Sequence, residues 1–418
     1  MRNCIYGGKA CWNCGICGAM AGEYAASSPE MPKLFLKRLQ HVEEGYGIAF
    51  DIGTTTVAGY LCDLKERSII AHQALTNPQI VHGSLASERL DYAAKSPENA
   101  EVLKQLITDR LNELTKKLLG RIDASAVRRV AVAGNPVMCR LLSDVSGISV
   151  SEAEPFVYPG LSDAVGGDVT AGLLAADVPN LKGNNLYVDI GTSIELVLSA
   201  EGKLFVCKSD AGPVFEGGEI DQGMRAVPGA IDKLKITDVF VRMDTVKQDI
   251  PRGICGAGIA DAAASLLSAG ISGRDGNFIS AEEAKNTLSR NIASLLHERS
   301  AGRSYELYPG IDFSEKDMKN VLRAAQAVSS DILKLAEKAG IALSQIDRVF
   351  LAGPYANYIQ TSSAVILGIV PDTGENSVFH TGNAAGIGAC MALLSPEVRE
   401  MAVKLSDDVV SFPPSLVE

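Results

Sequence analysis

The sequence predicts a duplicated α/β architecture. A segment in which an apolar run leads to an Asp, a glycine turn and small hydroxyl residues occurs twice, at 47–56 and 185–194. Two further strand-like runs follow each copy, at 57–64 and 68–75 in the first half and at 195–200 and 203–208 in the second. A long helical segment and then a strand ending in Ala-Gly come later in both halves, at Gly134 and Gly353. Each half is therefore expected to contain three strands, a helix, a strand and a helix.

Each repeated hairpin carries groups that suit a phosphate and its metal ion. Turn hydroxyls and free N–H groups donate to phosphate oxygens, and an Asp at a strand end can hold the water shell of Mg²⁺. A single Asp-x-Gly-Thr motif fits an ordinary strand and turn equally well, so the repetition carries the interpretation. Two facing hairpins would grip a nucleoside triphosphate. Asp51 and Asp189 would face the cation, and the phosphates would contact Gly53, Thr54, Thr55, Thr56, Gly191, Thr192 and Ser193.

Length and charge restrict the class of protein. A chain of 418 residues predicts two or three domains. The formal net charge of −11 disfavours nucleic acid or an anionic membrane surface as the main partner. The sequence has no apolar run of about 18 residues, and its N-terminus lacks an apolar signal core. We therefore expect a cytoplasmic protein.

The cysteines point to a metal centre near the N-terminus. Four of the nine lie within the first 17 residues with the spacing C-x6-C-x2-C-x2-C, namely Cys4, Cys11, Cys14 and Cys17. The C-x2-C-x2-C core resembles the cluster-binding runs of bacterial ferredoxins, which favours an iron–sulfur cluster of the [4Fe–4S] type. A structural zinc site and a disulfide or redox thiol are the alternatives. The other cysteines are expected to be small buried residues, at Cys62, Cys139, Cys207, Cys255 and Cys390.

We divide the chain into a four-cysteine segment at 1–24, a linker with a short helix at 25–46, a first half at 47–180 and a second half at 181–418. Helices are expected between Ser96 and Gly120 and between Ser314 and Gly340, because each has a capping residue at both ends. A further helix should open within 253–258. Residues 150–184 read as a loop-rich hinge between the halves, and the tail after Ser406 as a frayed end.

These motifs together resemble the actin/Hsp70/sugar-kinase superfamily. Residues 51–56 look like its first phosphate motif and 189–193 like its second, and the turn at 351–353 is similar to its adenosine motif. Residues 134–135 and 384–386 fall where the two connecting helices of that superfamily lie. The resemblance implies a ribonuclease H-like ATPase fold with ATP bound in a cleft between the halves. It also places Gly353 and Pro354 near the adenosine.

Within this superfamily the sequence is most similar to the reductive activators of corrinoid-dependent methyltransferases. These are iron–sulfur proteins that use ATP to drive one electron onto an inactive cob(II)alamin centre. The resemblance covers about residues 47–395 and rests on the segments 77–79, 134–138, 189–192, 211–217, 223–226 and 253–256. It implies nucleotide contacts at Gly217 and Gly218. It also implies a corrinoid protein or corrinoid-dependent methyltransferase as partner and a low-potential electron donor such as ferredoxin, with a homodimer as one possible state.

Two departures from that family are visible. Its better-known members begin with a plant-type [2Fe–2S] domain and contain an additional middle domain, and we expect neither here, so the four-cysteine segment would replace the first. The adenosine turn continues as Pro354-Tyr355-Ala356-Asn357 in place of further Gly and Phe, which predicts altered nucleotide affinity or base preference. Glu195 and Glu216 are the candidate general bases. Three alternative functions stay open: an activator of another low-potential enzyme such as a 2-hydroxyacyl-CoA dehydratase, a small-molecule kinase, and a non-redox ATPase or scaffold with structural zinc.

Overall fold

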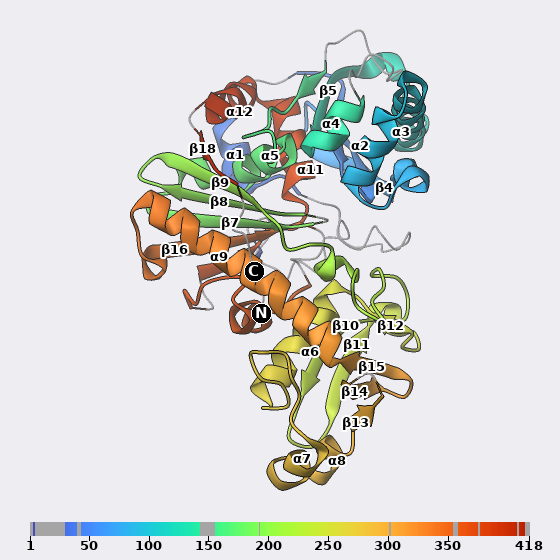
Figure 1. Cartoon of the computed structure of the whole chain (residues 1–418). Helices are drawn as coiled ribbons and strands as arrows, with labels where there is room; N and C mark the ends of the chain where they lie inside the picture. The colour runs from blue at the N-terminus through green and yellow to red at the C-terminus, as the bar shows by residue number, and fades with distance from the viewer. Residues whose placement is uncertain are drawn as a thin grey trace.

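The computed structural model confirms the duplicated α/β architecture (Figure 1). It describes residues 3–4, 30–39, 43–142, 155–191, 193–300, 302–353, 358–374, 377–407 and 409–413. Two mixed sheets each begin with three antiparallel strands and add parallel strands later in the chain. A further lobe with two small sheets extends from the second half. Within the described residues, no helix combines the length and apolar character needed to cross a membrane.

The first half is built on a five-stranded sheet with the order β4-β3-β2-β5-β6. Its strands are β2 (Tyr46–Ile52), β3 (Thr56–Asp63), β4 (Ser68–Thr76), β5 (Val127–Gly134) and β6 (Phe156–Val157). The predicted helix after β4 is α3 (Pro97–Leu119), in which the Ser96 hydroxyl accepts a hydrogen bond from Asn99 N and Gly120 is the C-cap. Its leucines pack on the apolar side chains of β2 and β3. Three shorter helices complete this half: α1 (Lys33–Arg38) in the predicted linker, α2 (Ala86–Ala94) and α4 (Pro136–Leu142).

The second half is built on a seven-stranded sheet with the order β1-β17-β16-β7-β8-β9-β18. Its strands are β1 (Asn3–Cys4), β7 (Asn184–Ile190), β8 (Ile194–Ala200), β9 (Lys203–Ser209), β16 (Ile346–Ala352), β17 (Val378–His380) and β18 (Val409–Ser411). The predicted long helix is α9 (Glu315–Ala339), with a capping box at Ser314 and Gly340 as its C-cap. The expectation of a frayed tail is wrong for 409–411, because these residues pair with β9 as a parallel edge strand.

Two helices lie between the sheets, α5 (Gly167–Ala175) and α11 (Ala384–Leu394) (Figure 1). The prediction of a loop over 150–184 is therefore wrong for 167–175. Gly388 lets the two helices touch, since a Cβ there would lie 2.1 Å from the Ala171 carbonyl oxygen. The connecting helix expected after Gly134 is also placed differently, because that segment forms α4, which contacts α2 and α3, whereas α5 is the helix packed on α11. The prediction of α11 itself is confirmed.

The additional lobe, which the sequence did not predict, inserts between β9 and α9. It contains two three-stranded sheets and is joined to the seven-stranded sheet by α9, which contacts β8 and β9 as well as β14 and β15 (Figure 1). Its elements are β10 (Ala230–Ile236), β11 (Val241–Thr245), β12 (Gly253–Ile254), α6 (Gly256–Ser268), α7 (Ala281–Thr287), α8 (Arg290–Ala293), β13 (Leu296–Arg299), β14 (Gly302–Tyr308) and β15 (Ile311–Ser314). The helix predicted to open within 253–258 is α6, which begins at Gly256. Helices α10 (Thr361–Leu367) and α12 (Pro396–Asp407) follow β16 and α11.

Cysteines outside the N-terminal segment are free. Cys62, Cys207, Cys255 and Cys390 are buried as predicted, and Cys139 is partly buried. Burial raises the pKa of Cys207 and Cys255 to about 12, as expected for inert thiols.

Candidate nucleotide and cation site

The first phosphate turn joins β2 to β3, which pair as far as Ile52 and Val57. The Gly53 N–H donates to the Thr56 carbonyl oxygen at 2.9 Å and closes the turn. Thr54 is 6% exposed, and its hydroxyl accepts a hydrogen bond from Asn135 Nδ2 at 3.1 Å. On the other side, Asn77 donates through its backbone N–H to the Thr55 carbonyl oxygen (2.8 Å) and through Nδ2 to the Gly53 carbonyl oxygen (2.9 Å). The turn is therefore held from both sides by asparagines.

The second phosphate turn is one residue shorter. β7 and β8 pair as far as Ile190 and Ile194, so residues 191–193 make the turn, whereas 53–56 make the first. Gly191 N–H donates to the Ser193 carbonyl oxygen at 3.0 Å, and the Ser193 hydroxyl donates to Glu195. Thr192 lies outside the described residues.

Gly353 brings the predicted adenosine turn against the second phosphate turn. Its φ is +89°, and a Cβ there would lie 2.4 Å from the Ile190 carbonyl oxygen and 2.5 Å from Asp189 Oδ1. Only glycine accommodates both the backbone angle and this approach. Pro354 lies outside the described residues.

Four carboxyl groups come together here: Asp51, Asp189 and Glu195 near the ends of β2, β7 and β8, and Asp168 in the first turn of α5. Glu195 is buried and the other three are partly buried, and desolvation is the largest cause of a raised pKa in all four. The pKa of Asp51 rises to about 7, with a smaller contribution from the charge of Asp168. The pKa of Asp189 lies well above its ordinary value, and the charges of Glu195, Asp168 and Asp51 add to the effect of burial. The charge of Asp168 contributes to the raised pKa of each of the other three, which groups the four carboxyls around it.

Asp168 and Glu195 have raised pKa values, and Lys208 is the cation among the groups that act on them. Burial raises the pKa of Asp168 to about 6, and burial and the charge of Asp168 raise that of Glu195 to about 7. Lys208 acts in the opposite direction on both. Four carboxyls facing one ammonium group leave an excess of negative charge, which a divalent cation would offset.

The donor set fits Mg²⁺, which prefers oxygen ligands and keeps several of its waters. Across the described ranges, no group of three or more His, Cys, Asp or Glu side chains is arranged to hold a metal by itself. Contact through the water shell of the ion, together with phosphate oxygens, is the arrangement that these carboxyls permit.

Asn383 connects this site to α11. It is the N-cap of that helix, where its Oδ1 accepts from Gly386 N at 2.9 Å. Its Nδ2 donates to Asp51 Oδ2 at 2.7 Å and lies 3.1 Å from the Tyr60 hydroxyl. This hydrogen bond links the Asp51 carboxyl on β2 to α11, which lies near the C-terminal end of the sequence.

Three predicted site residues belong to the loop after β9, and others fall outside the described residues. Gly217 and Gly218 follow β9 in the loop that leads to the additional lobe, where they pack against Met224 and Pro213. Glu216 belongs to the short turn Val214–Glu216 in the same loop. Cys11, Cys14 and Cys17 lie outside the described residues, and for Cys4 only the backbone, paired beside β17, is described.

Sequence reasoning missed Asp168, Asn383 and Lys208 as site residues. Asp168 stands in the first turn of α5, and the signal for it was an acid after two glycines and before a run of small apolar residues. Asn383 directly precedes the predicted helix at 384–386, which is an N-cap position. Lys208 could be found by alignment of the second hairpin, since Glu195 and Lys208 are directly opposite each other on β8 and β9.

Comparison with known proteins identifies the family. Residues 183–414 match the C-terminal domain of RACo, the ASKHA domain, and residues 46–156 match the RACo middle region. The chain belongs to the RACo family. The ASKHA domain is an ATPase-type domain, which implies ATP and Mg²⁺ binding.

The second match corrects one expectation. We expected the middle domain of this family to be missing, but residues 46–156 match it. They form the five-stranded sheet with α2, α3 and α4. The expectation treated the middle region as an addition to the duplicated fold, whereas it is the first half of that fold.

The relatives agree with this assignment. The corrinoid activation enzyme RamQ of Eubacterium limosum is 30% identical over 387 residues, covering 84% of this chain and 65% of RamQ. The [Co(II) methylated amine-specific corrinoid protein] reductase of Methanosarcina barkeri is 24% identical over 422 residues, covering 87% of this chain and 73% of that protein. A solved reductive activator for corrinoid,iron-sulfur protein superposes with a TM-score of 0.75 at 27% identity, covering 90% of this chain and 64% of its own. The chain spans less than two thirds of the length of RamQ and of the solved activator.

Proposed function

We propose that this chain is an ATP-hydrolysing reductive activator. It would deliver one low-potential electron to the cob(II)alamin form of a corrinoid protein or corrinoid-dependent methyltransferase. The observation that carries the proposal is the grouping of one buried and three partly buried carboxyls beside two phosphate-type turns in a chain of the RACo family. The names of the three relatives, all of which concern corrinoid activation or reduction, support this class of target.

The residues of the site have distinct roles in this proposal. The two turns would hold the phosphates through Thr54, Thr55, Thr192 and Ser193, and Asp51 and Asp189 would hold the water shell of Mg²⁺, which neutralises phosphate charge. Glu195 would act as general base, since a carboxylate with a pKa of about 7 is both ionised and basic near neutral pH. Ser193, which donates to Glu195, would orient it.

We assign the electron relay to the N-terminal cysteines Cys4, Cys11, Cys14 and Cys17. They would bind a [4Fe–4S] cluster, which supplies one-electron transfer, with a ferredoxin-like protein as donor. The energetic need is moderate: at about 59 mV per tenfold for one electron, an uphill step of about 250 mV requires roughly 6 kcal/mol. Closure around ATP or its hydrolysis would supply that free energy.

The first test is anaerobic purification with iron and sulfide analysis and electron paramagnetic resonance of the dithionite-reduced protein. We expect about four irons and four sulfides per chain, followed by ATP-dependent reduction of cob(II)alamin on a corrinoid protein. Asp189→Asn should abolish the ATP dependence, and Asp91→Asn, on the exposed face of α2, should leave it unchanged. Stoichiometric zinc without iron after anaerobic reconstitution would refute the relay. ATPase activity stimulated by a small-molecule acceptor alone would indicate a kinase.

A further inference from the structure

Asn383 bridges the two halves of the molecule at the candidate site. Just before it, Thr381 is bonded to β16 of the seven-stranded sheet: its backbone N–H and its hydroxyl donate to the Leu351 carbonyl oxygen at 2.9 and 3.1 Å. The same strand leads to Gly353 in the predicted adenosine turn. On the other side, Asn383 Nδ2 donates at 2.7 Å to Oδ2 of Asp51, which lies on β2 of the five-stranded sheet. This short segment therefore joins the predicted adenosine turn of one half to a carboxyl of the other.

Three contacts fix the orientation of the Asn383 amide. Its Oδ1 accepts from Gly386 N at 2.9 Å as the cap of α11. Its Nδ2 donates to Asp51 Oδ2 at 2.7 Å and to the Tyr60 hydroxyl oxygen at 3.1 Å. Exchange of the amide oxygen with its nitrogen would set an acceptor against the Asp51 carboxyl and a donor against the Gly386 N–H. Because both of those contacts would be unfavourable, the amide is held with its donor towards Asp51.

Tyr60 on β3 keeps this amide in place. The tyrosine side chain is 1% exposed. A Cβ on Gly386 would lie 2.5 Å from the Tyr60 hydroxyl oxygen, so the phenol packs directly on the first turn of α11. His72 stands opposite Tyr60 on the neighbouring strand β4, and the two rings stack with centroids 6.5 Å apart and planes at 20°. The hydroxyl that accepts from Asn383 is thus fixed from two sides.

These contacts leave one oxygen of the Asp51 carboxyl for a ligand. Asn383 occupies Oδ2, and within the described ranges no hydrogen bond or ion pair reaches Oδ1. Asp51 is partly buried, and none of the fully buried, unpartnered side-chain atoms in the described part of the chain belongs to it. Its Oδ1 therefore keeps contact with solvent and can accept from a water molecule. A carboxyl that holds the water shell of a divalent cation requires such an oxygen.

We propose that Asn383 and Tyr60 are positioning residues for the divalent cation that accompanies the nucleotide. Asn383 holds Asp51 with Oδ1 free for the water shell of the ion, and Tyr60 holds the Asn383 amide. That the ion is Mg²⁺ and the nucleotide ATP rests on the proposed function. Replacement of a group that orients a metal-facing side chain typically weakens metal binding about 10- to 100-fold. Because the same segment is bonded to the strand of the adenosine turn, cation and nucleotide should strengthen the binding of each other through Asn383.

The first experiment measures how much Mg²⁺ strengthens the binding of a non-hydrolysable ATP analogue, as the ratio of the dissociation constants without and with the ion. Asn383→Ser keeps a capping residue for α11 but removes the amide that donates to Asp51. Tyr60→Phe keeps the ring and removes the hydroxyl. By calorimetry, the ratio should fall on the order of tenfold in Asn383→Ser and by less in Tyr60→Phe. A variant that only loosens the fold would weaken binding with and without Mg²⁺ alike, and its ratio would not change.

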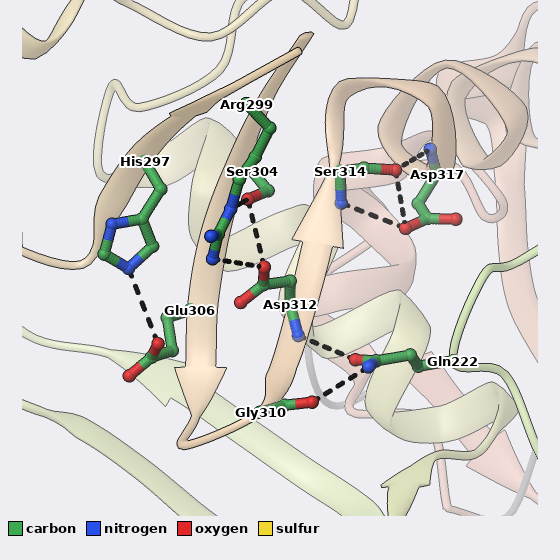
Figure 2. Close-up of polar contacts among 9 residues, drawn as sticks. All are labelled: Gln222, His297, Arg299, Ser304, Glu306, Gly310, Asp312, Ser314 and Asp317. Carbon is green, nitrogen blue, oxygen red and sulfur yellow. Dashed lines mark hydrogen bonds and ion pairs between the residues drawn. The ribbon is translucent and has the colours of Figure 1, made fainter. Parts of the chain in front are cut away.

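Ser314→Ala is the matched control, because it removes a helix cap in the additional lobe. Ser314 precedes α9 as Asn383 precedes α11: its hydroxyl accepts from Asp317 N at 3.1 Å and donates to Asp317 Oδ2 at 2.8 Å, as Figure 2 shows. This variant should have a lower thermal midpoint through the loss of its cap and the Mg²⁺ ratio of wild type. Equal ratios in all four proteins would overturn the proposal. A ratio that falls as far in Ser314→Ala as in Asn383→Ser would do the same.

The second experiment measures Mn²⁺ binding in the presence of ADP by electron paramagnetic resonance, and it requires neither ATP hydrolysis nor electron transfer. Wild type and Ser314→Ala should bind Mn²⁺ equally, and Asn383→Ser on the order of tenfold more weakly. Equal Mn²⁺ affinity in all three would refute the positioning role even in a chain that reduces cob(II)alamin. Selective loss in Asn383→Ser, in a chain that does not reduce cob(II)alamin, would instead refute the proposed function and retain the positioning role. A wild-type chain that binds no Mn²⁺ would refute both.

Discussion

Replacement of Asp51 by Asn should stabilise the protein without Mg²⁺ and nucleotide above neutral pH. The pKa of Asp51 is raised from 3.8 to about 7, mainly by burial. Between these values the folded protein holds a proton that the unfolded chain has lost, so the free energy of unfolding falls as the pH rises from about 4 to 7 and then levels off. Asn is neutral at every pH and escapes this cost. Its side-chain carbonyl can still accept the hydrogen bond from Asn383, which measures 2.7 Å to Asp51.

The magnitude follows from the size of the pKa shift. Three pKa units at about 1.4 kcal/mol each set an upper bound of about 4 kcal/mol. Because Asp51 keeps some contact with solvent, screening reduces this to about 1–2 kcal/mol. With about 2.1 cal/mol/K of unfolding entropy per residue over 418 residues, the thermal midpoint should rise by about 1–2 °C at pH 8. At pH 4 the midpoints of variant and wild type should coincide.

The assay is thermal unfolding of wild type, Asp51→Asn and the exposed control Asp91→Asn from pH 4 to 8. Repetition with Mg²⁺ and an ATP analogue at about 100 times the dissociation constant should stabilise wild type by about 2.7 kcal/mol. The variant, which lacks a cation-facing carboxylate, should gain little, so the order of stability should reverse. An Asp51→Asn protein that is less stable than wild type at pH 8 without ligand would refute this reasoning. So would a stability difference that does not change with pH.

Three further predictions concern the centre of the fold and the site. Gly388→Ala should cost about 1–3 kcal/mol in urea unfolding, because its Cβ would lie 2.1 Å from the Ala171 carbonyl oxygen; an unchanged midpoint would contradict the close packing of α5 on α11. Gly353→Ala should weaken nucleotide binding at least on the order of tenfold in calorimetry, since its Cβ would displace Asp189; retained affinity would separate this turn from the site. Glu195→Gln should lower kcat for ATP hydrolysis about 10²-fold with little change in KM. It should also abolish the rise of the hydrolysis rate through pH 7. A higher KM with an unchanged kcat would exclude Glu195 as the base.

Local patterns were enough to predict the elements that surround the site. The hairpins at 47–56 and 185–194 can be predicted because a strand, an Asp, a glycine turn and hydroxyl residues follow one another within ten residues. Helices α3 and α9 were predicted to within a residue or two because Ser96 and Ser314 cap them and their apolar residues recur on one face. In such segments the residues that determine the secondary structure lie close together in the sequence.

The missed features depend on tertiary contacts. Helix α5 is buried between two sheets on nearly every side, so its sequence shows no apolar stripe, and two glycines before Asp168 suggest a loop. Four of the six strands of the additional lobe have five residues or fewer, which leaves little room for alternation. The hydrogen bond from Asn383 to Asp51 joins residues 332 positions apart in the chain, and no local pattern encodes it.

The two repeated hairpins differ in the residues that stand opposite one another across their strands. In the second half, Asp189, Glu195 and Lys208 stand directly opposite one another across β7, β8 and β9. The same row in the first half reads Asp51, Ala58 and Ala74. Residues in one such row share a face of the sheet and lie within direct interaction distance of their neighbours. The second half thus places an acid with a pKa of about 7 between a carboxyl and an ammonium group, whereas the first half has only the carboxyl. The second hairpin therefore holds a further acid and a cation beside its carboxyl, whereas the first pairs its carboxyl, whose pKa is also about 7, with alanines alone along this row.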